Sequence, residues 1–120
     1  MSHTLSLQLS LTDLDALAVA AGRCGALVLG AGAYRLFEGK EAIQGVGVQL
    51  EGWNFPVIVC SDGSIKYDNM EGAWGAPERL HDLVAYYGLE AARSAALRAG
   101  HSCYESISDG ALVLTVQMGV

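Results

Sequence analysis

Two Asp-Gly pairs constrain the fold of this 120-residue chain more than any other feature. Asp62-Gly63 separates residues 57–60 from 65–67, and Asp109-Gly110 separates residues 102–107 from 112–118. The flanking runs have the composition of strands, and Asp-Gly supplies the positive φ angles that a tight hairpin turn requires. The sequence therefore predicts two antiparallel hairpins.

Further strands are predicted before the first of these turns. Leucines recur at every second position through residues 4–11, with polar residues between them, which is the pattern of a half-buried strand,. Short β-like segments separated by glycines follow, and together they indicate a meander: residues 26–29, 34–37, 46–50 and 56–60,.

Apolar residues at helical spacing predict three helices,. The first begins after Thr12, which is expected to be its N-cap. The second begins at Pro77, a residue favoured in the first turn, and is expected to break at Gly88. A third, alanine-rich helix is expected over residues 89–99. Glycines stand where the first and third helices should end: Gly25 and Gly100,.

The order of these elements indicates the fold class. Helices alternate with antiparallel hairpins, and no linker, charge block or low-complexity tract divides the chain. We therefore expect one domain over residues 1–120 with an α+β fold. The expected architecture is a two-layer sandwich, in which helices cover one face of a mostly antiparallel sheet in a ferredoxin-like arrangement.

Charge and composition argue against several partners. The chain has 13 acidic and 7 basic residues, a net charge of −6, and its basic residues are dispersed. Nucleic acids and anionic membranes are poor candidates because they are bound mainly through clustered cationic side chains. The start of the sequence lacks the pattern of a secretory leader, and no apolar run approaches the ~18 residues of a membrane span. We expect a cytoplasmic protein.

The order of several motifs resembles a known family. Ser2-His3, the alternating strand and Thr12-Asp13-Leu14-Asp15-Ala16-Leu17 are followed by Ser61-Asp62-Gly63-Ser64, the segment around Glu71 and Trp74, and the Asp109-Gly110 hairpin. This succession is similar to the hypothetical chloroplast open reading frame 35 family, also called domain of unknown function 1257. The resemblance implies a cyanobacterial, plastid, bacterial or phage-borne cytosolic protein, and it assigns no catalytic role to any residue.

Two glycine motifs fall short of nucleotide-binding patterns. Residues 28–32 begin like a dinucleotide-binding turn, but Arg35 stands where the third glycine belongs and residues 34–37 read as a strand,. We expect a flexible β connection there instead. Gly39-Lys40 is followed by Glu41, whereas a phosphate loop needs a hydroxyl at that position,.

Metal and thiol chemistry has similarly weak support. Cys24, Cys60 and Cys103 are widely spaced, without a CxxC pair,. His101 and Cys103 could offer two ligands on one face of a strand, and His81 or Cys60 could join them only through the fold,. Chance accounts for such a scatter, so we expect no metal, no cofactor and no catalytic residue. Cys103 is the one thiol open to a reactive role.

Two loops combine aromatic residues with glycines. One contains Trp53 and Phe55 before a strand, and the other contains Glu71 and Trp74 before a helix. Such aromatics serve either as contact surfaces for partners or as lids over the edge of the core. We take these four residues as the candidate partner-binding site.

The resulting hypothesis is a non-enzymatic binding or adaptor protein that acts through protein–protein contacts. Its expected partner is either another protein or a second copy of the chain in a homodimer. In the first case the protein could be a phage-borne inhibitor of a host protein. Self-association is plausible because free sheet edges without protecting Lys or Pro tend to pair with other chains. The alternative is a small-ligand-binding domain or small enzyme, with a pocket between helices and sheet that involves His81, His101 or Cys103.

Overall fold

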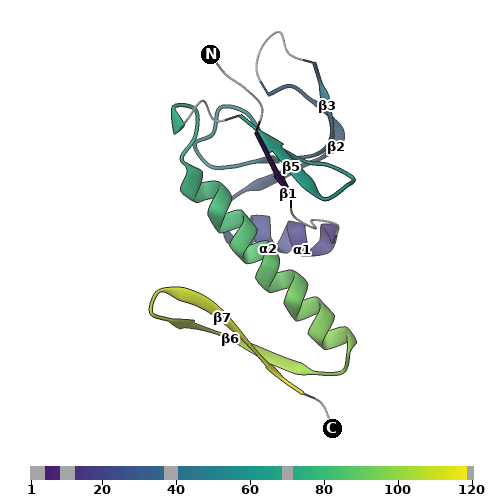
Figure 1. Cartoon of the computed structure of the whole chain (residues 1–120), viewed down its shortest axis with the longest axis vertical. Coiled ribbons are helices and arrows are strands. Elements are labelled where there is room, and N and C mark those ends of the chain that lie inside the picture. Colours follow the sequence, from purple (N-terminus) through teal and green to yellow (C-terminus); the bar gives the residue numbers. More distant parts are fainter. Residues whose placement is uncertain (1–4, 9–12, 37–40, 69–71, 119–120) are drawn as a thin grey trace.

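The computed structural model describes residues 5–8, 13–36, 41–68 and 72–118. It contains two helices and seven strands in the order shown in Figure 1. Their bounds are β1 (Leu5–Gln8), α1 (Leu14–Arg23), β2 (Leu27–Tyr34), β3 (Ile43–Gln49), β4 (Val57–Val59), β5 (Ser64–Tyr67), α2 (Pro77–Arg98), β6 (Ser102–Ser108) and β7 (Ala111–Gln117). The expectation of an α+β fold is confirmed.

The strands form two antiparallel sheets. The first has five strands in the order β1-β5-β4-β3-β2, so that β2 to β5 make a meander and β1 joins it beside β5. Among the described residues, the second sheet consists of the hairpin of β6 and β7. The sequence predicted both hairpins, but a single sheet was expected and that expectation is wrong.

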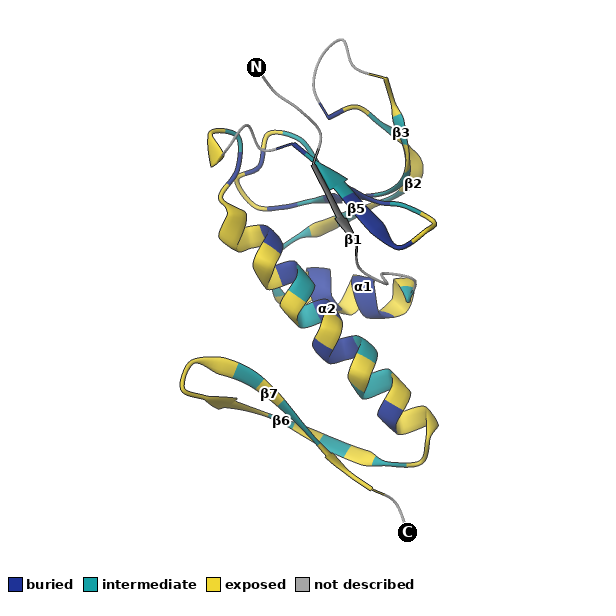
Figure 2. Ribbon diagram, in the orientation of Figure 1, coloured by how far each residue is buried: buried dark blue, intermediate teal, exposed yellow. Residues whose placement is uncertain are grey.

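Both helices pack on one face of the five-stranded sheet, as expected. Residues of β3, β4 and β5 form the core with the helices. Figure 2 shows buried residues recurring along α2 between exposed ones. Members of this core include Leu17, Ala20, Val48, Val57, Ile65 and Leu83. An N–H to hydroxyl hydrogen bond of 3.1 Å from Asp13 to Tyr87 also joins the start of α1 to α2.

The second sheet lies away from the first because of the length of α2. This helix has 22 residues, or about 33 Å, and the hairpin packs against its C-terminal half on the side away from the five-stranded sheet (Figure 1),. The molecule is accordingly elongated, with a radius of gyration of 15.5 Å against about 13–14 Å for a compact chain of this length,. The ferredoxin-like arrangement is not confirmed.

Both ends of α1 are capped as its local sequence predicts, except that the N-cap residue differs from the predicted one. Thr12 lies outside the described residues, and the N-cap is Asp13, whose carboxylate accepts a 3.0 Å hydrogen bond from the Ala16 N–H. At the other end, Gly25 has φ +75° and the Ala26 N–H donates to the Ala21 carbonyl at 2.9 Å. This is the glycine-dependent termination that the sequence predicted.

The expected break at Gly88 does not occur. A single helix, α2, runs from Pro77 through Gly88 to Arg98, and Gly100 follows it with φ +83°. Glycine costs only about 1 kcal/mol relative to alanine inside a helix. Burial of Leu83, Tyr87 and Leu89 on either side of Gly88 outweighs that cost, so the two predicted helices are one,.

Replacing Gly88 with alanine is expected to raise the free energy of unfolding by about 0.5–1 kcal/mol. A Cβ atom at Gly88 would meet no atom within 4 Å. The matched control is Gly45→Ala in β3, whose Cβ would lie 2.6 Å from the backbone oxygen of Val59 and should destabilise the protein. Urea denaturation followed by circular dichroism measures both changes. A change in the free energy of unfolding that has the same sign in both variants would contradict the prediction.

The Asp-Gly turns are present at both predicted positions. Asp109 and Gly110 have φ angles of 50° and 80° and connect Ser108 to Ala111, which is the two-residue turn with two positive φ angles,. At the first hairpin only Gly63 has a positive φ, of 88°. Its N–H donates to the Cys60 carbonyl at 2.9 Å, so this turn is one residue longer.

The two strands predicted around residues 26–29 and 34–37 are instead one strand, β2. It pairs with β3 from Leu27 to Tyr34, and its register shifts between Val28 and Gly30. Tyr34 folds back over the glycines in the middle of the strand, and its hydroxyl donates to the Gly30 carbonyl at 2.6 Å. Of the strand predicted over residues 4–11, the structure shows residues 5–8 as β1.

Candidate functional site

The structure brings the two aromatic loops together beside the start of α2. The Asn54 N–H donates to the Trp74 carbonyl at 2.8 Å, and the rings of Phe55 and Trp74 lie 5.4 Å apart at an angle of 58°. Phe55 and Trp74 are both half-buried. Of the predicted contact residues, these two therefore form one aromatic pair, while Glu71 lies outside the described residues.

Trp53 has a different position from the other two aromatics. Its side chain is only 6% exposed, its Nε1–H donates to the Ala76 carbonyl at 3.0 Å, and its ring packs against Gly75. Its ring centroid also lies 6.0 Å from that of Tyr67. The indole therefore attaches the segment before α2 to the sheet, and any part it takes in partner binding would be through holding that segment in place.

An exposed ion pair joins the loop after β3 to the first turn of α2. Glu51 and Arg79 approach to 3.7 Å, with 65% and 45% of their side chains accessible to solvent. An exposed pair of this kind contributes less than about 1 kcal/mol. This ion pair therefore adds little to the attachment of the loop to α2.

The histidines and cysteines do not converge. His81 is in the second turn of α2 and His101 follows its far end, which separates them by more than about 25 Å of helix,. Within the part of the chain that the structure describes, no three His, Cys, Asp or Glu residues form a cluster suited to a metal ion. Cys24, Cys60 and Cys103 are half-buried and unpaired with one another, and burial raises the pKa of the Cys24 thiol.

The glycines of residues 28–32 lie within the paired strand β2, whose register shifts between Val28 and Gly30. Gly30 and Gly32 pair with Gly47 and Gly45 of β3, so this segment is part of the sheet, and the expectation of a flexible connection is wrong. A dinucleotide-binding turn leads into a helix N-terminus, whereas the next element after β2 is β3. Gly39-Lys40 lies outside the described residues.

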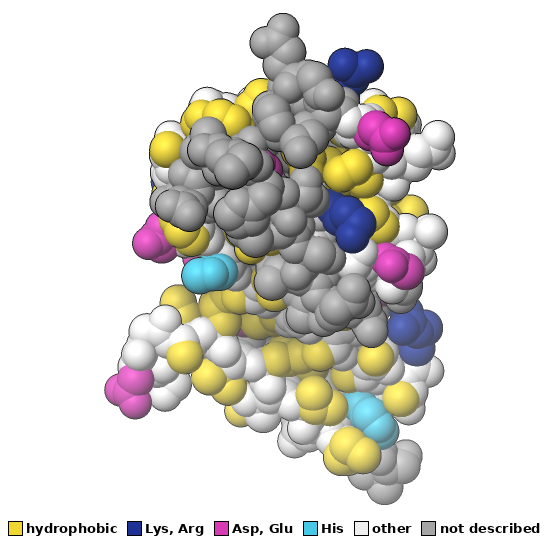
Figure 3. All heavy atoms as spheres, turned by 45° about the horizontal axis from the view of Figure 1, so that its top comes forward, with side chains coloured by type: hydrophobic (Ala, Val, Ile, Leu, Met, Phe, Trp, Pro, Cys, Tyr) yellow, Lys and Arg dark blue, Asp and Glu magenta, His cyan; other side chains and the backbone are white. Residues whose placement is uncertain are grey.

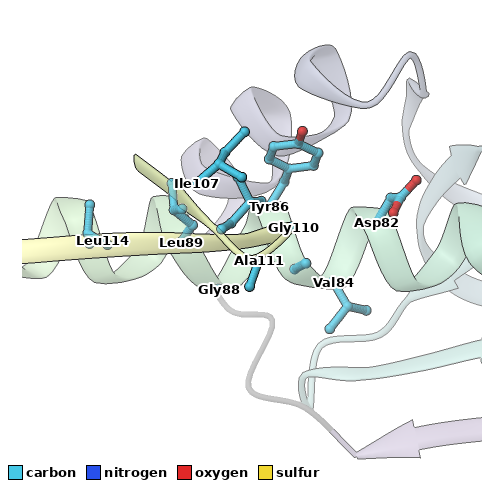
Figure 4. A pocket seen from close by; sticks show the side chains of 11 residues that line it. Asp82, Val84, Tyr86, Gly88, Leu89, Ile107, Gly110, Ala111 and Leu114 are labelled. Atoms are coloured by element: carbon cyan, nitrogen blue, oxygen red, sulfur yellow. The ribbon is translucent and has the colours of Figure 1, made fainter. Parts of the chain in front are cut away.

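Sequence reasoning missed a second site, a cavity of about 710 Å³ between α2 and the C-terminal hairpin. Figure 4 shows lining residues from both elements, with Tyr86 and Leu89 on the helix and Ile107, Ala111 and Leu114 on the hairpin. Asp82 and Tyr86 are the lining residues with polar side-chain atoms. No spacing signal could have found it, because its two walls are brought together only by the continuous α2.

A cluster of four charged residues holds the hairpin to the helices. Glu105 of β6 accepts hydrogen bonds from Arg23 at the end of α1 and from Arg93 of α2. Both arginines also pair with Glu90, Arg23 at 2.7 Å and Arg93 at 3.3 Å. The guanidinium of Arg23 lies 4.5 Å from the ring centroid of Tyr86.

Electrostatics within this cluster favour its charged form. The hydrogen bond from Arg23 lowers the pKa of Glu105 below its ordinary value of 4.5, with a smaller contribution from the charge and hydrogen bond of Arg93. The same hydrogen bond, with that to Glu90, raises the pKa of Arg23. All four groups are thus engaged with one another, which indicates a structural role for the cluster.

The hairpin itself is poorly covered. No residue between Ser102 and Gln117 is buried, as Figure 2 shows, and Ile107 is 74% exposed. Figure 3 shows hydrophobic side chains over the lower part of the molecule, where the hairpin lies, with few charged side chains among them. This apolar surface is the second candidate for a contact site.

No family model matches the chain, and neither a curated protein nor a solved structure matches it. Among the described residues, no helix is long and apolar enough to cross a bilayer.

Proposed function

We propose that this protein is a non-enzymatic binding protein that acts through protein–protein contacts, and that its C-terminal hairpin carries the main contact surface. The observation that carries the proposal is the exposure of apolar side chains on an element that has none buried. Ile107 is 74% and Val116 41% exposed, and Tyr104 is 58% exposed on the opposite face. Monomeric proteins rarely expose continuous apolar patches of more than a few hundred Å² without a partner.

The aromatic loops support this function less strongly than the sequence suggested. The side chain of Trp53 is buried in the core, so it is not available to a partner. Phe55 and Trp74 are half-buried and remain partly accessible. We propose that this pair is a secondary contact, because one aromatic pair is smaller than the surface that a stable interface buries.

A small-ligand-binding function is the second candidate, and the cavity beside α2 favours it. Its volume of about 710 Å³ lies within the range of ligand pockets, which is about 300–1,000 Å³,. Catalysis would need polar groups that converge on one point, and the lining offers only the side chains of Asp82 and Tyr86,. A ligand there would be mostly apolar. His81, His101 and Cys103 do not line this cavity.

Photo-crosslinking separates these functions. A benzophenone amino acid is placed at Ile107 on the hairpin, and the matched control carries it at Asn54, which is exposed in the aromatic loops. We expect a saturable protein adduct from Ile107 that excess unlabelled chain competes away, and a weaker one from Asn54. Adduct formation from Asn54 alone would move the contact surface to the loops. If neither position gives a protein adduct, the proposed function is wrong, and a stoichiometric small molecule in native mass spectrometry would support the alternative.

A further inference from the structure

We propose that the hairpin's partner is a second copy of this chain, joined through the outer edge of β7 about a two-fold axis. The inference rests on the proposed function, since it names the partner of that same surface. In the dimer, β6 and β7 of both copies would form one four-stranded antiparallel sheet.

The outer edge of β7 is open in the described part of the chain. The second sheet contains only β6 and β7, so β7 has a strand neighbour on one side alone. A two-stranded hairpin is marginally stable in water, and three or more strands or packing against a helix are needed to hold it. Here α2 covers one face of the hairpin incompletely, which leaves the cavity described above. Pairing of β7 with a further strand would supply the missing support.

The polar attachment of the hairpin is on β6 and leaves β7 free to pair. Glu105, which binds Arg23 and Arg93, belongs to β6. The residues of β7 that face α2, Leu112 and Leu114, line the cavity. A second copy could therefore approach the outer edge of β7 without disturbing the charged cluster.

Edge strands are usually protected against such pairing, and β7 is not. Native edge strands are protected by charges, prolines, bulges, short length or a covering helix or loop. The sequence from Gly110 to Val120 contains no charged residue and no proline, and β7 pairs with β6 without a shift in register. The edge strand β2 differs, because it has a register shift after Val28 and a glycine with φ +98° at position 30. Of these two edges, β7 is the one suited to pairing.

Exposed apolar side chains on the hairpin and at the end of α2 supply part of the area that a dimer interface needs. Exposed fractions are 74% for Ile107, 36% for Val113, 41% for Val116 and 69% for Met118, and Leu97 at the end of α2 is 57% exposed. With side chains of ordinary size, these five expose roughly 500 Å² per copy before any backbone is counted, against about 800 Å² per partner in a standard interface. Strand pairing adds the backbone of seven residues on each copy.

A second copy fits this edge because β7 is complementary to itself. With the axis beside Leu114, Leu112 of one copy faces Val116 of the other, and Val113 faces Thr115. Residues on the same face are then always opposite one another, as an antiparallel pair requires. The net charge of −6 disfavours close association in general, but none of that charge lies on β7, so no like charges meet across the axis,.

The test places like charges at two opposed positions of the proposed pair. Val113 and Thr115 lie on the face of β7 away from α2, by alternation with Leu112 and Leu114. We expect the unmodified chain to have twice its mass of 12.6 kDa in light scattering at ~100 μM, and Val113→Lys with Thr115→Lys to have the mass of one chain. The matched control is Ser106→Lys with Ser108→Lys, which adds the same charge to β6 and should remain a dimer.

A complementary variant excludes simple unfolding as the cause. Val113→Glu with Thr115→Glu should also be monomeric by itself, and mixing it with the lysine variant should restore dimers of mixed composition in native mass spectrometry. A wild-type chain that stays monomeric at this concentration, a lysine variant that stays dimeric, or a mixture that stays monomeric each overturns the inference. The proposed function is judged separately, because a monomeric chain could still give the competed Ile107 adduct with a different protein.

Discussion

Replacing Trp53 with alanine is expected to lower the free energy of unfolding by about 3–5 kcal/mol, a large part of the stability of a domain of this size. The side chain is 6% exposed and belongs to the main core cluster. Its removal leaves a cavity beside Tyr67 and takes away one of the two hydrogen bonds that the Ala76 carbonyl accepts, the other coming from the Arg79 N–H. Urea denaturation followed by far-ultraviolet circular dichroism measures the change without depending on indole fluorescence.

Two controls separate the contributions of Trp53. Trp53→Phe keeps most of the ring and loses the hydrogen bond to Ala76, so it should cost about 1–3 kcal/mol,. Trp74→Ala removes a half-buried ring from the same pair of loops and should cost less than Trp53→Ala,. A cost below 1 kcal/mol for Trp53→Ala, or a larger cost for Trp74→Ala, would contradict the position that the structure gives to Trp53.

Local chemistry made several features of this fold predictable. The positive φ angles of Gly63, Asp109 and Gly110 are at the turns that Asp-Gly pairs predict,. Pro77 opens α2 and Gly25 follows α1, since the conformational preferences of proline and glycine act within a few residues,. Signals of this short range do not depend on the rest of the fold.

The path of α2 was not predictable in the same way. Gly88 has a weak preference against helix, and packing of residues on both sides of it decides the outcome,. Because α2 continues past Gly88, the C-terminal hairpin packs against the C-terminal half of this helix and does not join the five-stranded sheet. The cavity and the open edge of β7 follow from that displacement, so the sequence alone could not locate them.

The candidate site was predicted in part for a related reason. The aromatic character of Trp53, Phe55 and Trp74 is evident from the sequence, but which ring fills the core depends on contacts such as that of Gly75 with Trp53. The charged cluster is harder still to predict from the sequence, because Arg23 is 67 residues from Glu90 and 82 from Glu105. No spacing rule relates residues so far apart in the chain.

Replacing Glu105 with glutamine is expected to loosen the hairpin while the five-stranded sheet stays folded. Glutamine is nearly the same size but cannot pair with the charges of Arg23 and Arg93,. Amide hydrogen exchange followed by nuclear magnetic resonance should show lower protection factors through β6 and β7 and unchanged ones in β4. The control Glu51→Gln removes a carboxylate from an exposed pair 3.7 Å apart and should leave the hairpin unchanged,.

Acidification should reproduce the effect of the Glu105 variant, because the pKa of Glu105 is lowered in the folded protein. A carboxylate with a lowered pKa stabilises the folded state fully above its ordinary value of 4.5, and that contribution is lost as the pH falls through the folded-state pKa,. Protection factors in β6 and β7 should therefore be constant from pH 7 to about 5 and decrease below pH 4.5. Glu105→Gln should lack this hairpin-specific decrease, since it has no proton to take up at that position. If the variant and the unmodified chain lose hairpin protection in parallel on acidification, Glu105 does not hold the hairpin, and the apolar contacts with α2 are what keep it in place.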